Sequence, residues 1–237
     1  MEFFIAGTDT GAGKTFVTAI LAAALIKEGL HTGVQKWITT GGVDQSGDVE
    51  FVRSALSGLL GAKALEKALF SYPYCLSFPA SPHLAAEIDG IHIDPEKILD
   101  QFEKMKALTD VLLIEGTGGI MVPITRKFLY TDLLEQLRPK VILVARSGLG
   151  TINHTLLTLE ALRTRGLEVL CVVMNPVNAL GDKDDSNSVI VRDNKRIIGE
   201  IGGIEVIGPL PFCQDLFERK PMDQLVPLAQ RIKEMVK

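Results

Sequence analysis

The feature that most constrains this chain is a glycine-rich turn that follows its first apolar run. Phe3–Ala6 is apolar, and Asp9-Thr10-Gly11-Ala12-Gly13-Lys14-Thr15 comes soon after it. A short strand, such a turn and Gly-Lys-Thr at the start of a helix are typical of a phosphate-binding loop (P-loop). The strict pattern has glycine where this chain has Thr8, but the flanking elements are those that the motif requires. We therefore predict that Gly11, Ala12, Gly13, Lys14 and Thr15 bind the phosphates of a nucleotide and that Thr15 ligates magnesium.

Apolar strands alternate with helical segments along all 237 residues. Continuously apolar strands separated by helices are typical of a parallel sheet covered on both faces. No repeat or long linker divides the chain, so we predict a single α/β domain over residues 1–237, a three-layer sandwich with the P-loop NTPase fold. The segment Asn178–Asn187 is expected to be the least ordered part. The predicted strands are Glu2–Ala6, Thr32–Lys36, Val111–Ile114, Val141–Ala145, Val169–Met174 and Glu205–Ile207.

Composition excludes several classes of function. The net charge is −4 and no basic block occurs, which argues against nucleic acid and anionic membranes as partners. The apolar segment Phe16–Ile26 is too short to span a bilayer and follows the P-loop, so we predict a buried helix. The first strand is predicted to begin near residue 2, so we expect no signal peptide. The cysteines Cys75, Cys171 and Cys213 match no metal-ligand spacing, so we expect them to fill the core of a cytoplasmic protein.

Charged or amide side chains stand where three of the predicted strands end. They are Lys36, Glu115 and Asn175. Ligands bind at the carboxyl ends of parallel strands, so chemistry is expected at this edge. P-loop proteins place an acid for magnesium where Glu115 stands, and we predict that it is a metal ligand. A lysine at the end of a buried strand is costly unless it meets an anion, so Lys36 is predicted to act with Lys14 on a transferring phosphoryl group.

Three features allow two interpretations each. Asp48, near the start of a predicted helix, either binds magnesium or caps that helix. Gly118-Gly119 either lets a ligand approach the backbone or forms a tight turn. The run Gly148–Asn153 either offers a helix N-terminus to a carboxylate or is an ordinary helix start.

These motifs closely resemble those of the dethiobiotin synthetase family over nearly the whole chain. Gly7–Thr10 with Gly13-Lys14-Thr15 is similar to the family's P-loop, including its threonine at position 8. Lys36 with Thr40-Gly41, Ser81-Pro82-His83, Glu115–Gly119 and Gly148–His154 resemble its further motifs. Two residues depart from the family pattern. Trp37 replaces a proline and bears on how the substrate's amines are seated, and Gly11 replaces an acidic residue that many members have near the phosphates.

The resemblance implies a ring closure that consumes ATP. One amine of 7,8-diaminononanoate takes up carbon dioxide as a carbamate, ATP phosphorylates the carbamate, and the second amine closes the ring and expels phosphate. It implies catalytic roles for Lys36, Lys14 and Thr10, and magnesium ligands in Thr15, Asp48 and Glu115. It also implies that Gly118, Asn175, Pro209, Leu210 and Pro211 bind the nucleotide, Asn175 by reading adenine. Substrate contacts are implied for Lys36, for Thr40 and, from the partner of a homodimer, for Gly150, Thr151, Ile152 and Asn153.

Two other classes of P-loop protein are less consistent with the sequence. Ligases that amidate a carboxylate with glutamine-derived ammonia usually carry a glutaminase domain, for which 237 residues leave no space. Switch ATPases of septum placement or chromosome partition carry a second lysine in the loop, where this chain has Asp9. They also tend to have a terminal amphipathic membrane helix, and only Val236-Lys237 follows the last predicted helix here.

Overall fold

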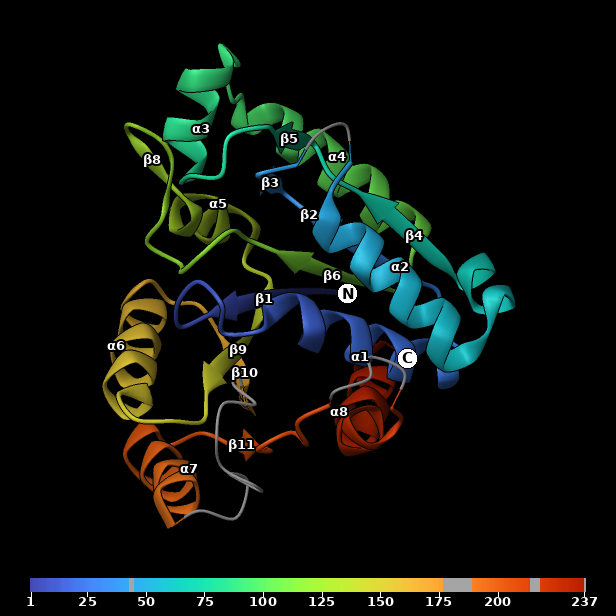
Figure 1. Ribbon diagram of the computed structural model, residues 1–237, viewed down its shortest axis with the longest axis vertical. Coiled ribbons are helices and arrows are strands. Elements are labelled where there is room, and N and C mark those ends of the chain that lie inside the picture. The colour runs from blue at the N-terminus through green and yellow to red at the C-terminus, as the bar shows by residue number, and fades with distance from the viewer. Residues whose placement is uncertain (43–44, 177–188, 214–217, 237) are drawn as a thin grey trace.

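The computed structural model describes residues 1–42, 45–176, 189–213 and 218–236. These residues form one seven-stranded sheet with helices on both sides, and two small two-stranded sheets (Figure 1). The order of strands in the large sheet is β11-β10-β9-β1-β6-β2-β4. In chain order the elements are β1 (Glu2–Gly7), α1 (Lys14–Lys27), β2 (Thr32–Lys36), β3 (Ile38–Thr40), α2 (Gly47–Leu60), η1 (Ala62–Lys67), β4 (Ala68–Ser71), β5 (Tyr74–Leu76), α3 (Pro82–Asp89), α4 (Pro95–Leu108), β6 (Val111–Glu115), β7 (Pro123–Thr125), β8 (Phe128–Leu129), α5 (Tyr130–Leu137), β9 (Lys140–Arg146), α6 (Thr151–Thr164), β10 (Val169–Asn175), α7 (Val189–Gly202), β11 (Val206–Ile207) and α8 (Lys220–Val236).

All neighbouring strands of the large sheet are parallel. This confirms the predicted α/β fold, and each of the six predicted strands is present within one residue of its expected bounds. Five further strands were not predicted from the sequence: β3, β4, β5, β7 and β8, which have between two and four residues each. Such short strands have too few residues to reveal a periodic pattern. The segment Asn178–Asn187, predicted to be the least ordered part, lies outside the described residues.

The two faces of the sheet bury separate cores. One core packs β1, β2 and β6 against α1, α2 and α8, and the other packs the opposite face against α3 to α7. Helix α1 is apolar all round because it lies between the sheet and the helices α2 and α8. This confirms the buried helix predicted over Phe16–Ile26. No helix among the described residues has the length and apolarity that crossing a membrane requires.

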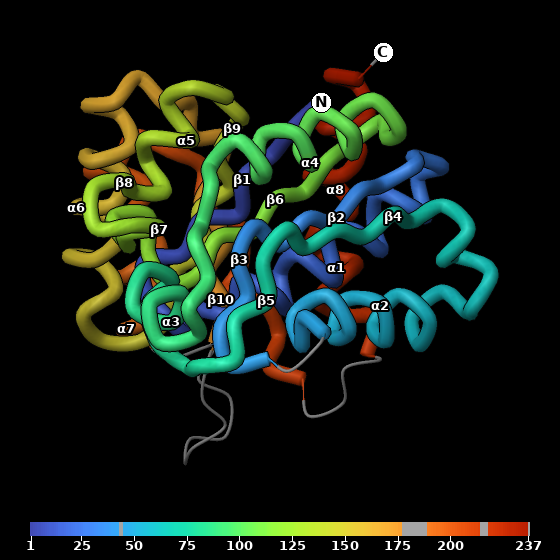
Figure 2. The backbone as a smooth tube through the Cα atoms, turned by 90° about the horizontal axis from the view of Figure 1, so that it is seen from above, coloured from blue at the N-terminus to red at the C-terminus, as the bar shows by residue number. Residues whose placement is uncertain are grey.

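The carboxyl ends of the central strands bring the candidate residues to one edge. The P-loop follows β1, while Lys36 ends β2, Glu115 ends β6 and Asn175 ends β10. In the register of the sheet Lys36 is the direct partner of Glu115. Seen from above, β3, β5 and α3 lie together on one side of this edge (Figure 2). The Ser81-Pro82-His83 motif, at the start of α3, is thus close to Thr40 at the end of β3.

The cysteines are not all core residues. Cys171 is fully buried in β10, as predicted, and burial raises the pKa of its thiol to about 12. Cys75 and Cys213 are only half-buried, so the expectation that all three cysteines fill the core was wrong for these two. Cys75 lies in β5, a strand of a small two-stranded sheet, and Cys213 lies in irregular chain after β11, so neither belongs to the large sheet.

Candidate active site

The P-loop has the backbone of an anion-binding turn. Gly11 and Gly13 have φ values of 71° and 88°, which residues with a Cβ adopt at a cost. Gly13 occupies the N-cap position of α1, and no side chain caps that helix, so its first N–H groups are free to meet a phosphate. A Cβ on Gly13 would also lie 1.9 Å from Nδ2 of Asn175. Glycine at this position is therefore required by both conformation and space.

Lys14 is buried beneath the loop. Its ammonium donates to the Gly118 carbonyl at 2.8 Å and, more weakly, to the Asp9 carbonyl at 3.5 Å. Burial lowers the pKa of Lys14, with Glu115 acting in the opposite direction. Within the described residues the Lys14 ammonium donates to carbonyl groups alone, and such a desolvated ammonium is suited to receive an anion. Gly118, which has a φ of 73°, thus serves Lys14 through its carbonyl oxygen.

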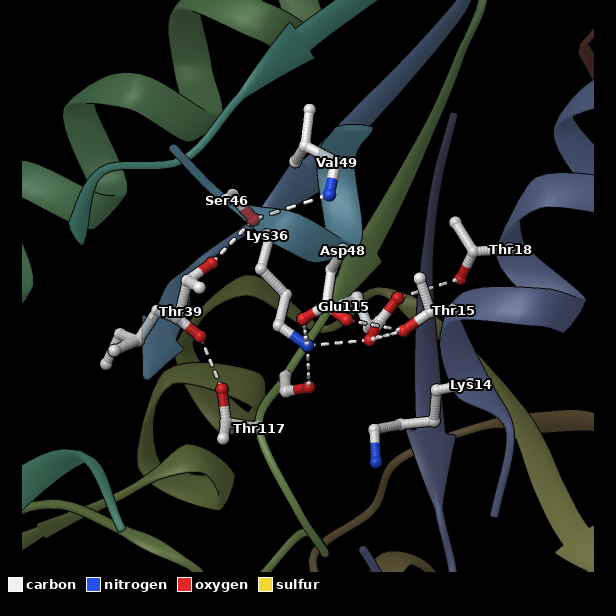
Figure 3. Close-up of polar contacts among 12 residues, drawn as sticks. Lys14, Thr15, Thr18, Lys36, Thr39, Ser46, Asp48, Val49, Glu115 and Thr117 are labelled. Carbon is white, nitrogen blue, oxygen red and sulfur yellow. Dashed lines mark hydrogen bonds and ion pairs between the residues drawn. The ribbon is translucent and has the colours of Figure 1, made fainter. Parts of the chain in front are cut away.

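The predicted magnesium ligands converge on one point (Figure 3). The Thr15 hydroxyl lies 2.9 Å from Oδ1 of Asp48 and 2.8 Å from Oε1 of Glu115. Thr18, one helical turn after Thr15, donates to the second Glu115 oxygen at 3.2 Å. The sequence analysis did not single out Thr18, although its spacing of three residues from Thr15 places both on one face of the helix. Its hydroxyl orients the Glu115 carboxylate.

Lys36 joins the two carboxylates. Its ammonium lies 2.6 Å from Oε1 of Glu115 and 2.8 Å from Oδ2 of Asp48, and it donates to the Gly116 carbonyl at 3.1 Å. Burial alone would lower the pKa of Lys36, but these two carboxylates raise it above the ordinary value. The anions that Lys36 meets are thus the chain's own carboxylates, and its predicted action on a phosphoryl group stays a prediction. Lys14 points away from the cluster, so the two ammonium groups have different surroundings (Figure 3).

Asp48 is not the cap of its helix. The hydroxyl of Ser46 accepts a hydrogen bond from the Val49 amide and caps α2, while Asp48 lies in the first turn and faces Lys36 and Thr15. Burial raises the pKa of Asp48, but Lys36 outweighs it and holds the value below the ordinary range. Of the two interpretations of Asp48, the geometry contradicts helix capping. The carboxylate instead belongs to the site.

The donor set suits a hard divalent cation that also binds phosphate. Magnesium typically takes one or two carboxylates, with substrate phosphates and water completing its shell. Thr15, Asp48 and Glu115 offer two carboxylates and a hydroxyl beside the P-loop. Within the described residues no cluster of three or more His, Cys, Asp or Glu side chains could hold a metal by itself. These donors fit an ion that shares its ligands with a nucleotide.

The residues predicted to contact the base lie on the other side of the loop. Asn175 is 5% exposed, and its amide donates to the Ala12 carbonyl at 3.2 Å, so it supports the P-loop directly. Pro209 and Pro211 are half-buried, whereas the Leu210 side chain is fully buried in the core. The Leu210 amide donates to the Met174 carbonyl, which fixes this segment against β10. Only the backbone of Leu210 can therefore face a base.

The predicted substrate residues fall into two groups. Thr40, half-buried at the end of β3, shares its strand with Thr39, whose hydroxyl lies 2.6 Å from that of Ser46. Gly150, Thr151, Ile152 and Asn153 form the start of α6, which follows β9, and β9 is separated from β2 by two strands. Thr151 is buried and donates to the Arg146 carbonyl, whereas Gly150 and Asn153 are exposed. A single chain does not bring this helix start to Lys36.

The two departures from the family pattern have different surroundings. Trp37 is fully buried, with its ring stacked on Tyr130 at 6.1 Å and tilted against Phe4 at 5.2 Å. Its ring therefore belongs to the core and cannot touch a substrate directly. Gly11 is exposed, and a side chain there would start 3.4 Å from the guanidinium of Arg146. Arg146, which the sequence analysis did not single out, donates from Nη2 to the Thr10 carbonyl at 2.7 Å.

The fold and this site define a nucleotide-binding protein of the P-loop NTPase class. Similar solved structures include the MinD cell division protein of Aquifex aeolicus, with a TM-score of 0.57 and 16% identity, covering 98% of this chain and 97% of that one. A ParA family ATPase of Chlorobium tepidum has a TM-score of 0.54 and 14% identity, covering 99% of this chain and 98% of that one. At such identities the likeness shows the fold alone.

Sequence comparison identifies the family within this class. A family model described as an AAA domain matches residues 1–220. The ATP-dependent dethiobiotin synthetase of Methanococcus vannielii is 39% identical over 214 residues, which cover 90% of this chain and 95% of the relative. That of Clostridium perfringens is 34% identical over 226 residues, which cover 94% of this chain and 95% of the relative. The chain belongs to the dethiobiotin synthetase family, a family of ATP-dependent ligases, as its motifs predicted.

Proposed function

We propose that this protein closes the ureido ring of dethiobiotin from 7,8-diaminononanoate, carbon dioxide and ATP. The observation that carries the proposal is the meeting of Lys36, Glu115 and Asp48 beside a P-loop, in a chain of this family. The reaction requires cations around a carbamate and a phosphoryl group, and it requires no nucleophile from the enzyme. The site supplies those cations.

The chemistry has three steps. A neutral amine of the substrate attacks carbon dioxide and loses a proton, giving a carbamate. A carbamate oxygen then attacks the γ-phosphorus of ATP, the bond to the β–γ bridging oxygen breaks, and ADP leaves. Finally the second amine attacks the carbamoyl carbon, loses its proton, and inorganic phosphate departs as the ring closes. In every step negative charge develops on an oxygen of the carbamate or of a phosphate, where fixed cations stabilise it.

Lys14, Lys36 and magnesium have separate roles in the proposed reaction. Lys14, on the P-loop, contacts the outer phosphates, and Lys36 neutralises the carbamate and the phosphoryl group that it receives. Thr15, Asp48 and Glu115 would hold magnesium, which would neutralise charge on the phosphates. Thr10 and Thr40 contact the phosphate or the substrate. Thr18 positions Glu115 through the hydrogen bond to its second oxygen.

The nucleotide base and the substrate carboxylate use the outer parts of the site. Asn175 reads adenine, and Pro209, Leu210 and Pro211 flank the base. The protein acts as a cytoplasmic homodimer, in which the start of α6 of one subunit receives the carboxylate of the substrate bound by the other. This arrangement is supported by the exposed Gly150 and Asn153 and by their separation from Lys36 in one chain.

Phosphate release from magnesium-ATP tests the proposed reaction. We expect phosphate release to require bicarbonate and 7,8-diaminononanoate together. With 8-aminononanoate, which lacks the second amine and cannot close the ring, the reaction should stop at the carbamate or its phosphate. The variant Lys36→Met removes the central ammonium, while Lys27→Met removes an exposed lysine at the end of α1 and serves as the matched control. Phosphate release that does not depend on the diamine would instead identify a P-loop ATPase with a different function.

A further inference from the structure

The end of β9 places an arginine at the rim of the P-loop. β9 is the neighbour of β1 in the sheet, with Val144 opposite Gly7, and the Thr8 amide donates to the Val144 carbonyl at 3.0 Å. Arg146 is the last residue of β9, so its side chain leaves the sheet where the loop begins. Its Nη2 donates to the Thr10 carbonyl at 2.7 Å. The guanidinium is therefore held against the loop from outside.

Most of this guanidinium remains available. The side chain of Arg146 is 48% exposed. Its Nε and Nη1 have no hydrogen-bond acceptor in the part of the chain that the structure describes, and its one ion pair, with Asp9, is 4.0 Å long. Asp9 is itself 56% exposed, and its carboxylate accepts from the Thr10 amide, so the pair is a weak surface contact.

The loop leaves space for this side chain. Gly11 is exposed, and a Cβ on it would lie 3.4 Å from Nη2 of Arg146. The two lysines of the site have different surroundings, since Lys36 is compensated by two carboxylates and Lys14 lies beneath the loop. Arg146 is a third cation, which approaches the phosphate site from the side of β9. A guanidinium with free donors is well suited to bind two phosphate oxygens at once.

We infer that Arg146 binds the γ-phosphate of ATP and stabilises it during transfer, as a catalytic residue of this site. The inference rests on the proposed function for the identity of the acceptor, but its contact with ATP does not depend on the diamine. During transfer the γ-phosphorus loses its bond to the ADP oxygen and gains one to the carbamate oxygen. Arg146 keeps its protons throughout and donates hydrogen bonds to the non-bridging oxygens.

Binding of two nucleotides separates this role from a structural one. We compare the affinity for magnesium-ADP and for a non-hydrolysable ATP analogue in wild type, Arg146→Met and Arg146→Lys by calorimetry. Arg196→Met, which removes an exposed arginine of α7 that pairs with Asp193 and Glu200, is the control. Arg146→Met is expected to weaken the analogue about tenfold or more and ADP less than about twofold, because only the analogue has a γ-phosphate. Arg146→Lys should recover part of the loss.

Turnover and stability provide the second readout. Diamine-dependent phosphate release by Arg146→Met is expected to fall about a hundredfold or more at saturating ATP, with the midpoint of thermal unfolding unchanged. Equal losses for ADP and the analogue would show that Arg146 only supports the Thr10 carbonyl, and would overturn the inference. If Arg146→Met loses affinity for the analogue but not for ADP, and the wild type releases phosphate without diamine, the proposed reaction is contradicted and the role of Arg146 stands.

Discussion

Lys36 and Glu115 are register partners at the ends of β2 and β6, and the Lys36 ammonium lies 2.6 Å from the Glu115 carboxylate. Their side chains are only 6% and 3% exposed, so each charge depends on the other for compensation. Because Glu115 also accepts from Thr15 and Thr18, the pair links the cation of the proposed transfer step to the proposed metal ligands.

The first prediction concerns the coupling within this pair. Lys36→Met leaves the buried Glu115 without its cation, and Glu115→Gln leaves Lys36 with Asp48 alone. Breaking a buried ion pair costs about 3–5 kcal/mol, and the Asp48 contact should reduce the loss in Glu115→Gln below that range. The double variant removes both charges and should be more stable than the sum of the single effects predicts. Urea unfolding of the four proteins measures the coupling, and simple additivity would contradict it.

The second prediction concerns acid stability. Lys36 holds the pKa of Asp48 below its ordinary value of 3.8. A carboxylate with a lowered pKa in the folded state contributes stability above its unfolded pKa and loses it as the pH falls through the lowered value. Asp48→Asn should therefore be less stable than wild type above about pH 4, and the difference should shrink toward zero in stronger acid. Unfolding curves from neutral pH to pH 2 measure this difference in the free energy of unfolding. A difference that does not change with pH would contradict the ion pair between Lys36 and Asp48.

The third prediction concerns Lys14. Burial lowers its pKa in the protein without nucleotide, and an adjacent phosphate should raise it again. Between the lowered pKa and the ordinary value of 10.5, binding of ATP should therefore take up protons. Calorimetry in buffers of different ionisation enthalpy measures this uptake. Its disappearance in Lys14→Met would assign it to this residue, and unchanged uptake in that variant would contradict the assignment.

The fourth prediction uses two glycines with similar backbones. Gly13 and Gly29 have φ values of 88° and 96°, so a substitution by alanine strains both. Only at Gly13 does the new Cβ meet another group, Nδ2 of Asn175, while nothing lies within 4 Å at Gly29. Both variants should lose about 1–2 kcal/mol from the strain, but only Gly13→Ala should also lose nucleotide affinity, by about tenfold or more. Equal nucleotide affinities in the two variants would contradict this prediction and show that the P-loop still binds nucleotide when its backbone is displaced.

The fifth prediction concerns Trp37, whose ring is fully buried against Tyr130 and Phe4. Trp37→Ala should destabilise the fold by about 3–5 kcal/mol, because it leaves a cavity in the core. Trp37→Phe should fold with a smaller loss and keep the Michaelis constant for the diamine, since the ring does not face the substrate. A large change of that constant in the stable Trp37→Phe protein would reveal an influence on the substrate through the backbone.

Residues within continuous patterns could be predicted from the sequence. Six strands, the buried helix after the P-loop and the edge position of Lys36 and Glu115 all follow from apolar runs and the parallel-sheet rule. The capping of α2 could not be decided, because Ser46 and Asp48 are both good caps by composition and only the orientation of the backbone distinguishes them.

Contacts between segments that are far apart along the chain could not be predicted from the sequence. Arg146 was passed over because it ends an apolar strand and meets Thr10 only through the adjacency of β9 and β1. Trp37 was expected to affect the seating of the amines because it follows Lys36 directly. Its side chain faces the opposite way from that of Lys36, because successive side chains of an extended chain alternate. In the core that receives Trp37, its ring contacts Phe4 of β1 and Tyr130 of α5.

The most direct test of the proposed reaction follows a labelled carbon from bicarbonate into the product. Incubation of the protein with 13C-bicarbonate, magnesium-ATP and 7,8-diaminononanoate should give dethiobiotin carrying a single label, in a one-to-one ratio with released phosphate. Lys36→Met should lose both products together, and Lys27→Met should keep both. Phosphate released without labelled dethiobiotin would contradict the account at its centre.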